Sequence, residues 1–282
     1  FFFFSNGRPN SDVLRLWANG QALAGRPSVI WVIDFGTNIS EADASLYELP
    51  FAYIQEHVKP VRATNNDSNR RNNWWRFGRT GADLRAASVG LERVIATVRV
   101  SKHRFFVWLH ASISADSRLF VICRDDDFTF GVLSSRLHEV WALANASRHG
   151  VGNDPTYNAG DCFETFPFPQ ASEAAKAAIA EAAKKLDDMR TRWLFPAEWV
   201  DCVPEIVAGF PERRVAKTGH EAALKARTMT NLYNALPAWL IQRHEALDKA
   251  VAIAYGWTDY SAATTDDEIL RRLSVLNTQR SC

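Results

Sequence analysis

The sequence predicts an α+β protein in which a mixed β-sheet domain over residues 1–170 precedes a mainly α-helical domain over residues 171–282. Before about residue 170, short runs of aromatic and β-branched residues alternate with turn residues, which is typical of strands and loops. From Ser172 onward, apolar residues recur at helical spacing. A chain of 282 residues is long enough to bury a substantial core, and two domains are the natural expectation.

Five segments of the first domain are predicted as strands because each is rich in aromatic or β-branched residues. They are residues 28–36, 93–100, 104–110, 118–124 and 128–133. Helical patterns over residues 40–58 and 134–147 interrupt these strands, and Ser40 is placed to act as the N-cap of the first helix. The first domain is therefore predicted to mix helices and strands.

The second domain is predicted to be helical apart from an irregular stretch rich in proline and tryptophan, residues 193–214. Ser172 is expected to cap its first helix, and Thr265 with Glu268 forms a capping box ahead of the last. The predicted helices cover residues 172–190, 220–236, 238–257 and 268–276. Just before them, Phe163–Pro169 contains two prolines, which cannot donate to a strand ladder, so it is predicted as a rigid extended connector.

Composition excludes several classes of protein. No run of about 18 apolar residues is present, so no membrane span is expected. The four cysteines are dispersed without a Cys-x-x-Cys pair, which argues against structural zinc and disulfides and favours a reducing cytoplasm. The sequence also lacks a Gly-rich nucleotide loop, a Gly-x-Ser-x-Gly nucleophile motif and a His-x-x-x-His pair. We therefore predict no catalytic residue, no cofactor-binding residue and no metal ligand in this chain.

A basic window is the most informative feature of the sequence. The segment from His57 to Arg104 contains eleven Lys and Arg residues but only three acidic residues, although the net charge of the whole chain is +1. Nine of these cations are arginines, which suit bidentate contacts with phosphates and guanine edges, and aromatic residues lie among them. The window predicts a polyanionic partner, with nucleic acid as the first candidate. The candidate contacts to a nucleic-acid backbone are Arg70, Arg71, Arg76, Arg79, Arg99, Lys102, His103 and Arg104.

The loop from His149 to Asp161 is rich in Gly, Asn and Asp and precedes the proline-rich connector. It is equally consistent with an ordinary surface loop and with a site that reads bases, because Asn pairs with adenine and Asp accepts from cytosine. If it reads bases, the candidate contacts are Arg148, His149, Asn153, Asp154, Tyr157 and Asn158.

Two alternative functions remain open from the residues alone. The three consecutive acids Asp125–Asp127 suggest a metal-dependent nuclease or hydrolase. Adjacent side chains on a strand point to opposite faces, however, so a solvated turn before the strand over residues 128–133 is favoured. The other alternative is a protein-interaction scaffold whose Trp-rich surface binds a partner and whose arginines are only solvated charge.

Several strings together carry a family resemblance that covers nearly the whole chain. In order, they resemble the target-recognition region of MmeI-like, type IIL, adenine-specific DNA methyltransferases. The matching strings are residues 7–20, 31–36, 47–65, 99–109, 124–133, 138–144 and 163–169. Residues 227–257 and 266–277 are similar to the helical C-terminal segment of the same proteins. One departure is Leu16, where relatives usually have proline.

The resemblance implies a division of labour. In the family, an S-adenosylmethionine-binding Gly-rich motif and an Asn-Pro-Pro-Phe/Tyr motif precede these strings, and neither is present here. This chain would then bind no cofactor, while the parent enzyme would use S-adenosylmethionine to methylate an adenine flipped out of double-stranded DNA. Residues 1–25 would connect it to the missing methylase core, and the chain alone would be inactive. The implied context is a restriction-modification or phage-defence system, with base reading in the loop ahead of Phe163.

Overall fold

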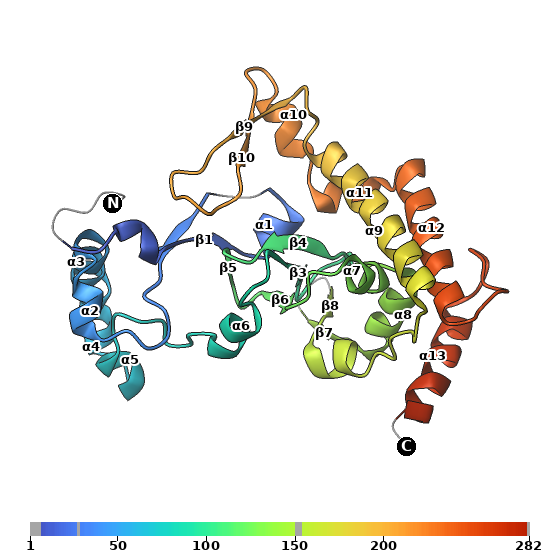
Figure 1. Cartoon of the computed structure of the whole chain (residues 1–282), viewed down its shortest axis with the longest axis horizontal. Helices are drawn as coiled ribbons and strands as arrows, with labels where there is room; N and C mark the ends of the chain where they lie inside the picture. Colours follow the sequence, from blue (N-terminus) through green and yellow to red (C-terminus); the bar gives the residue numbers. More distant parts are fainter. Residues whose placement is uncertain (1–6, 27–28, 150–153, 281–282) are drawn as a thin grey trace.

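The computed structural model describes residues 7–26, 29–149 and 154–280 and shows an elongated arrangement of helices and sheets (Figure 1). A small group of short helices lies at the N-terminal end, two three-stranded sheets occupy the middle, and long helices lie at the C-terminal end (Figure 1). The predicted α+β class is confirmed. Among the described residues, none of the helices combines the length and the apolar character that a membrane span requires.

The central sheet is antiparallel, with β3 (Arg93–Val98) between β4 (Val107–His110) and β6 (Leu119–Ile122). Alternate residues of β3 point to opposite faces. Val94, Ala96 and Val98 pack into one apolar cluster, whereas Ile95 packs into the larger cluster formed with the helices. Both faces of the sheet are therefore covered, which explains why β3 is apolar at nearly every position.

A second sheet lies against the central one. Its middle strand β1 (Leu14–Ala18) pairs with β2 (Trp31–Ile33) antiparallel and with β5 (Ser114–Ala115) parallel. After β1, the side chain of Asn19 accepts a hydrogen bond from Ala22 N and so begins α1 (Gly20–Ala24). Leu23 of α1 is buried in the same cluster as the outer face of β3, which joins the two sheets.

The N-terminal lobe is a set of short helices around a small core. Phe35, Tyr47, Ile54 and Trp74 are buried together there. The predicted helix over residues 40–58 is divided into two helices, although Ser40 caps the first of them as expected. The helices of this region are η1 (Asn10–Val13), α2 (Glu41–Ser45), α3 (Glu48–His57), α4 (Lys59–Ala63), α5 (Ser68–Asn72) and α6 (Ala82–Ala87).

The strand predicted over residues 128–133 is wrong, because this segment forms helix α7 (Asp127–Leu133). Asp126 accepts a hydrogen bond from Thr129 N at 2.8 Å and caps the helix, so the acids before the apolar run act as a helix start. Because α7 is buried on all sides, its sequence lacks the helical periodicity of apolar and polar residues that would have identified it as a helix. The next helix, α8 (Arg136–Asn145), is confirmed.

The C-terminal helices share one core with the sheet. Ile95, Phe130 and Leu137 belong to the same apolar cluster as Leu186 and Leu247, so packing is continuous across residue 170. Ser172 caps the first helix as predicted, whereas an unpredicted hairpin divides the helices. These elements are α9 (Glu173–Leu194), β9 (Val200–Val203), β10 (Arg213–Ala216), α10 (Glu221–Ala226), α11 (Met229–Ala235), α12 (Ala238–Ala254) and α13 (Asp266–Arg280).

The segment before α9 is held by packing. The π-helix η2 (Ala159–Glu164) includes the first residues of the predicted connector. Beyond it, Phe166 is buried, its ring lies 5.1 Å from that of Phe168, and the carbonyl oxygen of Pro167 accepts from Tyr255 Oη at 2.8 Å. The buried aromatic rings and the bond from Tyr255 therefore hold this segment against the C-terminal helices.

Candidate nucleic-acid interface

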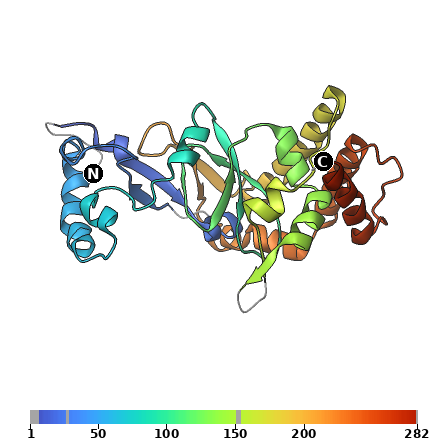
Figure 2. The same ribbon diagram turned by 90° about the horizontal axis from the view of Figure 1, so that it is seen from below.

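A two-stranded hairpin follows α8 and pairs with the end of the central sheet. It consists of β7 (Ser147–His149) and β8 (Asp154–Thr156), and it projects from the body of the molecule in the view from below (Figure 2). Thr156 forms a β-bridge with Val100, just beyond the end of β3. Within the predicted base-reading loop, His149 and Asp154–Thr156 therefore belong to a β-ribbon attached to the central sheet, whereas its last residues begin η2. Asn153 lies outside the described residues.

Three exposed arginines lie around the base of this hairpin. The backbone N–H of Arg99 donates to the carbonyl oxygen of Arg118 at 2.9 Å, and the carbonyl oxygen of Arg99 accepts from Tyr157 N at 2.7 Å. Arg148, on β7, is paired with Pro155 of β8. All three arginines are exposed, so the backbone pairing brings three cationic side chains to the same end of the sheet.

Arg118 was not among the candidates from the sequence, because it lies outside the basic window. The available signal was its place at the start of a predicted strand, next to the strand that carries Arg99. Among the described residues, no side-chain partner of Arg118 is found, whereas Arg99 donates only a long bond of 3.3 Å to Ser117 O. Both guanidinium groups are therefore accessible to an anionic partner.

A second set of exposed arginines belongs to the N-terminal lobe and the segment after it. Arg70 and Arg71 lie on α5, and Arg79 lies in the loop between α5 and α6. Arg70 is 3.5 Å from Asp67, and Arg71 donates to Asn65 O at 2.6 Å, both in exposed settings. Helices α5 and α6 and strand β7 all lie along the lower side of the molecule in Figure 1. The elements α5 and β7, which carry sequence-predicted cations, therefore lie along one side of the fold.

Arg104 does not belong to this surface and is a correction to the expected phosphate contacts. It is only 7% exposed, and its guanidinium donates to Thr97 Oγ1 at 2.9 Å, to Val98 O and to Pro155 O at 3.3 Å. Burial lowers the pKa of Arg104, and its guanidinium lies over the ring of Tyr157. Arg104 therefore holds the hairpin from beneath and cannot reach DNA.

Tyr157 and Asn158 are likewise occupied within the fold. Tyr157 is 1% exposed, and its Oη lies 2.8 Å from Nε2 of His138. Because burial lowers the pKa of His138 to about 3, that ring is neutral at physiological pH. Asn158 accepts from Asp161 N at 2.8 Å and so caps η2. The burial of Tyr157 rules out the expected base contact by its side chain.

Three further candidates lie in other surroundings. Arg76 is half-buried and donates to Thr37 O at 2.6 Å and to Asn73 Oδ1, so its guanidinium holds the N-terminal lobe together. Lys102 and His103 both contact Oδ1 of Asn234 on α11, at 2.9 and 2.8 Å. These two side chains therefore face the C-terminal helices.

The acids at Asp125–Asp127 do not gather into a metal site. Asp126 caps α7 and accepts from Arg124 at 2.8 Å, while Asp127 pairs with Arg93 at 3.0 Å and with Lys184 at 3.3 Å. Within the part of the chain that the structure describes, no group of three or more His, Cys, Asp or Glu side chains is placed to hold a metal ion. These carboxylates thus have structural partners, and the expected solvated turn is a helix cap.

The hairpin, the exposed arginines and the Asp126 cap of α7 all fall within one segment that matches a known family. Residues 41–170 match the family model described as the MmeI target recognition domain. These residues form an MmeI-type target recognition domain. The exposed arginines named above all belong to this target recognition domain, whereas Asn234, the partner of Lys102 and His103, lies beyond it.

Comparisons over longer stretches agree with that assignment. The chain is 26% identical over 185 residues to DNA methyltransferase A from Bacillus subtilis (strain 168), which covers 64% of this chain and 17% of that protein. Its fold matches the type IIL restriction-modification enzyme MmeI, solved in complex with DNA, with a TM-score of 0.68 at 18% identity. That match covers 96% of this chain and 32% of the MmeI chain. The chain with its target recognition domain therefore spans a minor part of the length of both proteins.

Proposed function

We propose that this chain is the DNA-recognition part of an S-adenosylmethionine-dependent adenine DNA methyltransferase in a restriction-modification or phage-defence system. The observation that carries the proposal is the match of residues 41–170 to the MmeI target recognition domain. The physical support is that this segment holds a projecting β-ribbon with exposed arginines around its base. Double-stranded DNA is the proposed partner, because clustered arginines suit a regular array of phosphates.

The exposed arginines would position the protein on the DNA backbone. Contacts to phosphates fix register and orientation but carry no sequence information. Arg99 and Arg118 lie at the base of the hairpin, and Arg70 and Arg71 are exposed on α5, which lies along the same side of the fold as β7. A ribbon flanked by such cations would be held against the duplex wherever it binds, and base contacts would then select the site.

The β7–β8 hairpin would read the bases. The major groove of B-DNA admits a two-stranded β-ribbon, and only there do all four base pairs show distinct donor and acceptor patterns. Arg148, His149 and Asp154 provide donors and acceptors on the hairpin, and Asn153 belongs to the same loop. A guanidinium selects guanine and a carboxylate selects cytosine, so these residues are the proposed specificity determinants.

Methyl transfer would take place on a methylase core that precedes this segment in the parent enzyme. S-adenosylmethionine would supply the methyl group to the exocyclic amine of adenine. The Gly-rich and Asn-Pro-Pro-Phe/Tyr motifs of that core are absent from this sequence, and we assign none of its residues to the cofactor. The contribution of this chain is to select and orient the DNA, and the proposed compartment is the cytoplasm.

The proposal is tested with the full-length enzyme. Its methylation sites on genomic DNA should change, or become degenerate at one position, in Arg148→Ala and Asp154→Ala enzymes that still methylate DNA. Arg192→Ala is a matched control, because Arg192 is an exposed arginine on α9, outside the target recognition domain. Unchanged site choice in both hairpin variants would remove the hairpin as the reader, and a wild-type enzyme that binds no duplex DNA would refute the function itself.

A further inference from the structure

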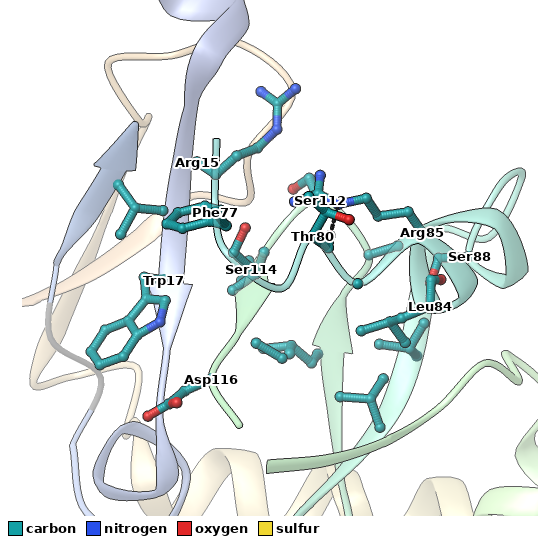
Figure 3. A pocket seen from close by; sticks show the side chains of 18 of the residues that line it. Arg15, Trp17, Phe77, Thr80, Leu84, Arg85, Ser88, Ser112, Ser114 and Asp116 are labelled. Atoms are coloured by element: carbon teal, nitrogen blue, oxygen red, sulfur yellow. Dashed lines mark hydrogen bonds between the residues drawn. The ribbon is translucent and has the colours of Figure 1, made fainter. Parts of the chain in front are cut away.

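A pocket of about 510 Å³ lies between the second sheet, α6 and the central sheet (Figure 3), and no residue of the β7–β8 hairpin is part of its lining. Arg15, Trp17 and Phe77 lie on one side of it, and Leu84 and Arg85 lie on the other (Figure 3). Its volume falls in the range of about 300–1,000 Å³ that is usual for small-ligand sites. The pocket is thus large enough for a ligand and is built from three separate parts of the chain.

The lining combines an apolar floor with a cationic rim. Val94, Leu109 and Val121 contribute apolar side chains from the central sheet. The rim carries the three arginines Arg15, Arg79 and Arg85 against one lining acid, Asp116, and it also offers hydroxyl groups. The hydroxyl-bearing residues of the lining are Thr80, Ser88, Ser112, Ser114 and Ser117. A ligand that matches this lining has a flat apolar part and an anionic part.

The three arginines of the rim differ in how many hydrogen bonds and ion pairs they already form within the protein. Arg85 donates to buried Asp34 at 2.7 Å and to Thr80 O at 2.7 Å, so its charge is neutralised and its position is fixed. Arg15 donates to Leu14 O at 3.0 Å, and no acidic side chain among the described residues pairs with its guanidinium. Arg79 is exposed, and no side-chain partner is found for it within the described part of the chain. Arg15 and Arg79 therefore supply uncompensated positive charge at this rim.

Phe77 supplies the aromatic face. Its side chain is 39% exposed, although it lies between the well-buried Trp74 and the polar loop that carries Arg79. In single-stranded nucleic-acid binding, bases stack on such aromatic faces while cations follow the backbone, and each stacked base contributes about 1–3 kcal/mol. Phe77 beside Arg15 reproduces that combination at the scale of one nucleotide (Figure 3).

We propose that this pocket binds one unpaired nucleotide of the DNA, with its base against Phe77 and its phosphate near Arg79 and Arg15. The inference rests on the proposed DNA-recognition function, because Arg79 is exposed and belongs to the same target recognition domain as the arginines of α5. It goes beyond that function by adding a site for DNA that is locally unstacked. Such a site would favour distorted DNA over regular duplex, independently of the base sequence read by the hairpin.

The test compares two DNA probes with the full-length enzyme: a regular duplex, and the same duplex with one extra unpaired nucleotide in a strand. The wild-type enzyme should bind the bulged duplex about tenfold more tightly, which corresponds to one stacked base. Phe77→Ala should abolish this preference while leaving affinity for the regular duplex unchanged. Arg79→Ala should reduce the preference and also weaken both complexes. Arg192→Ala, which lies outside the pocket, should retain the full preference.

Each outcome has a separate meaning. If the wild-type enzyme binds regular duplex and shows no preference for the bulge, the pocket proposal is overturned while the recognition function stands. If it binds neither probe, the recognition function fails. Retention of the preference in Phe77→Ala would also overturn the proposal, and because Phe77 is exposed, its loss is not expected to prevent folding. Recovery of the preference in Phe77→Tyr, which keeps an aromatic face, would support stacking.

Discussion

The backbone N–H of Tyr157 donates to the carbonyl oxygen of Arg99 at 2.7 Å, and this bond joins the β7–β8 hairpin to the central sheet. Beneath it, the buried guanidinium of Arg104 lies over the Tyr157 ring and donates to Pro155 O. The hairpin is thus anchored at its base by buried groups, while Ser147, Arg148 and His149 on β7 are exposed. A recognition element built in this way can vary at its tip without losing its position.

Replacement of Arg104 by lysine is predicted to destabilise the protein. Lysine cannot reproduce the fork of hydrogen bonds, so Val98 O or Pro155 O is left without its donor inside the fold. We expect the free energy of unfolding to fall by about 1–3 kcal/mol, as measured by denaturant titration. Arg99→Lys is the control: Arg99 is exposed, and its change should stay within about 0.5 kcal/mol. Equal stability of the two variants would show that Arg104 has no anchoring role.

Removal of Arg118 is predicted to weaken DNA binding by the full-length enzyme on all sequences alike. If Arg118 contacts one phosphate, the slope of log K against log salt concentration should fall by about one unit in Arg118→Ala. Arg99→Ala should have the same effect, since its backbone pairs directly with that of Arg118. The measurement is a series of binding titrations at increasing salt. An unchanged slope in both variants would place neither arginine on the DNA backbone.

Local signals predicted the long C-terminal helices and the strands of the central sheet, but not β1, several of the short N-terminal helices or the two hairpins. Ser40 and Ser172 cap helices where the sequence places them, because a cap depends on residues within one turn. The capping box at Thr265 is only half formed: Thr265 Oγ1 accepts from Glu268 N, but the Glu268 carboxylate binds Arg271 and Arg272 instead. The error at α7 has a different cause, because a segment buried on all sides has no periodicity to separate helix from strand.

The basic window identified a region with exposed arginines, but the sequence could not tell which of its arginines are exposed and which are buried. Arg99 and Arg104 are five positions apart, yet one is exposed and the other lies inside the fold. That difference arises from the packing of β8 against the end of β3, which joins residues far apart in the sequence. Arg118 was missed for the same reason, since only strand pairing brings it beside Arg99. Charge density in a sequence therefore predicts a partner class better than it predicts individual contacts.

The close approach of α7 and α9 requires a glycine at position 131. A Cβ added to Gly131 would lie 2.7 Å from Cγ2 of Ile179 and 3.0 Å from Cβ of Ala183. Gly131→Ala is therefore predicted to lower the free energy of unfolding by about 1–3 kcal/mol, because the helices must separate. Gly160→Ala is the control, since no described atom would lie within 4 Å of the added Cβ. If both variants unfold at the wild-type denaturant midpoint, the helices are not closely packed at this position.

Asp248 predicts a specific dependence of stability on pH. Burial raises its pKa from 3.8 to about 7, although its Oδ1 accepts from Arg136 N at 2.7 Å, which opposes the rise. Between these two pKa values, the folded state holds a proton that the unfolded state has lost, so stability falls as pH rises through this window. Asp248→Asn keeps the acceptor oxygen and does not titrate. The variant should therefore gain stability over the wild type as pH rises from about 4 to 7, by about 1.4 kcal/mol per unit of pKa difference.

The contributions of His138 and His244, whose lowered pKa values act in the opposite direction, are common to both proteins and cancel. Denaturant titrations of the two proteins across this range measure the difference, and a difference independent of pH would show that Asp248 keeps its ordinary pKa.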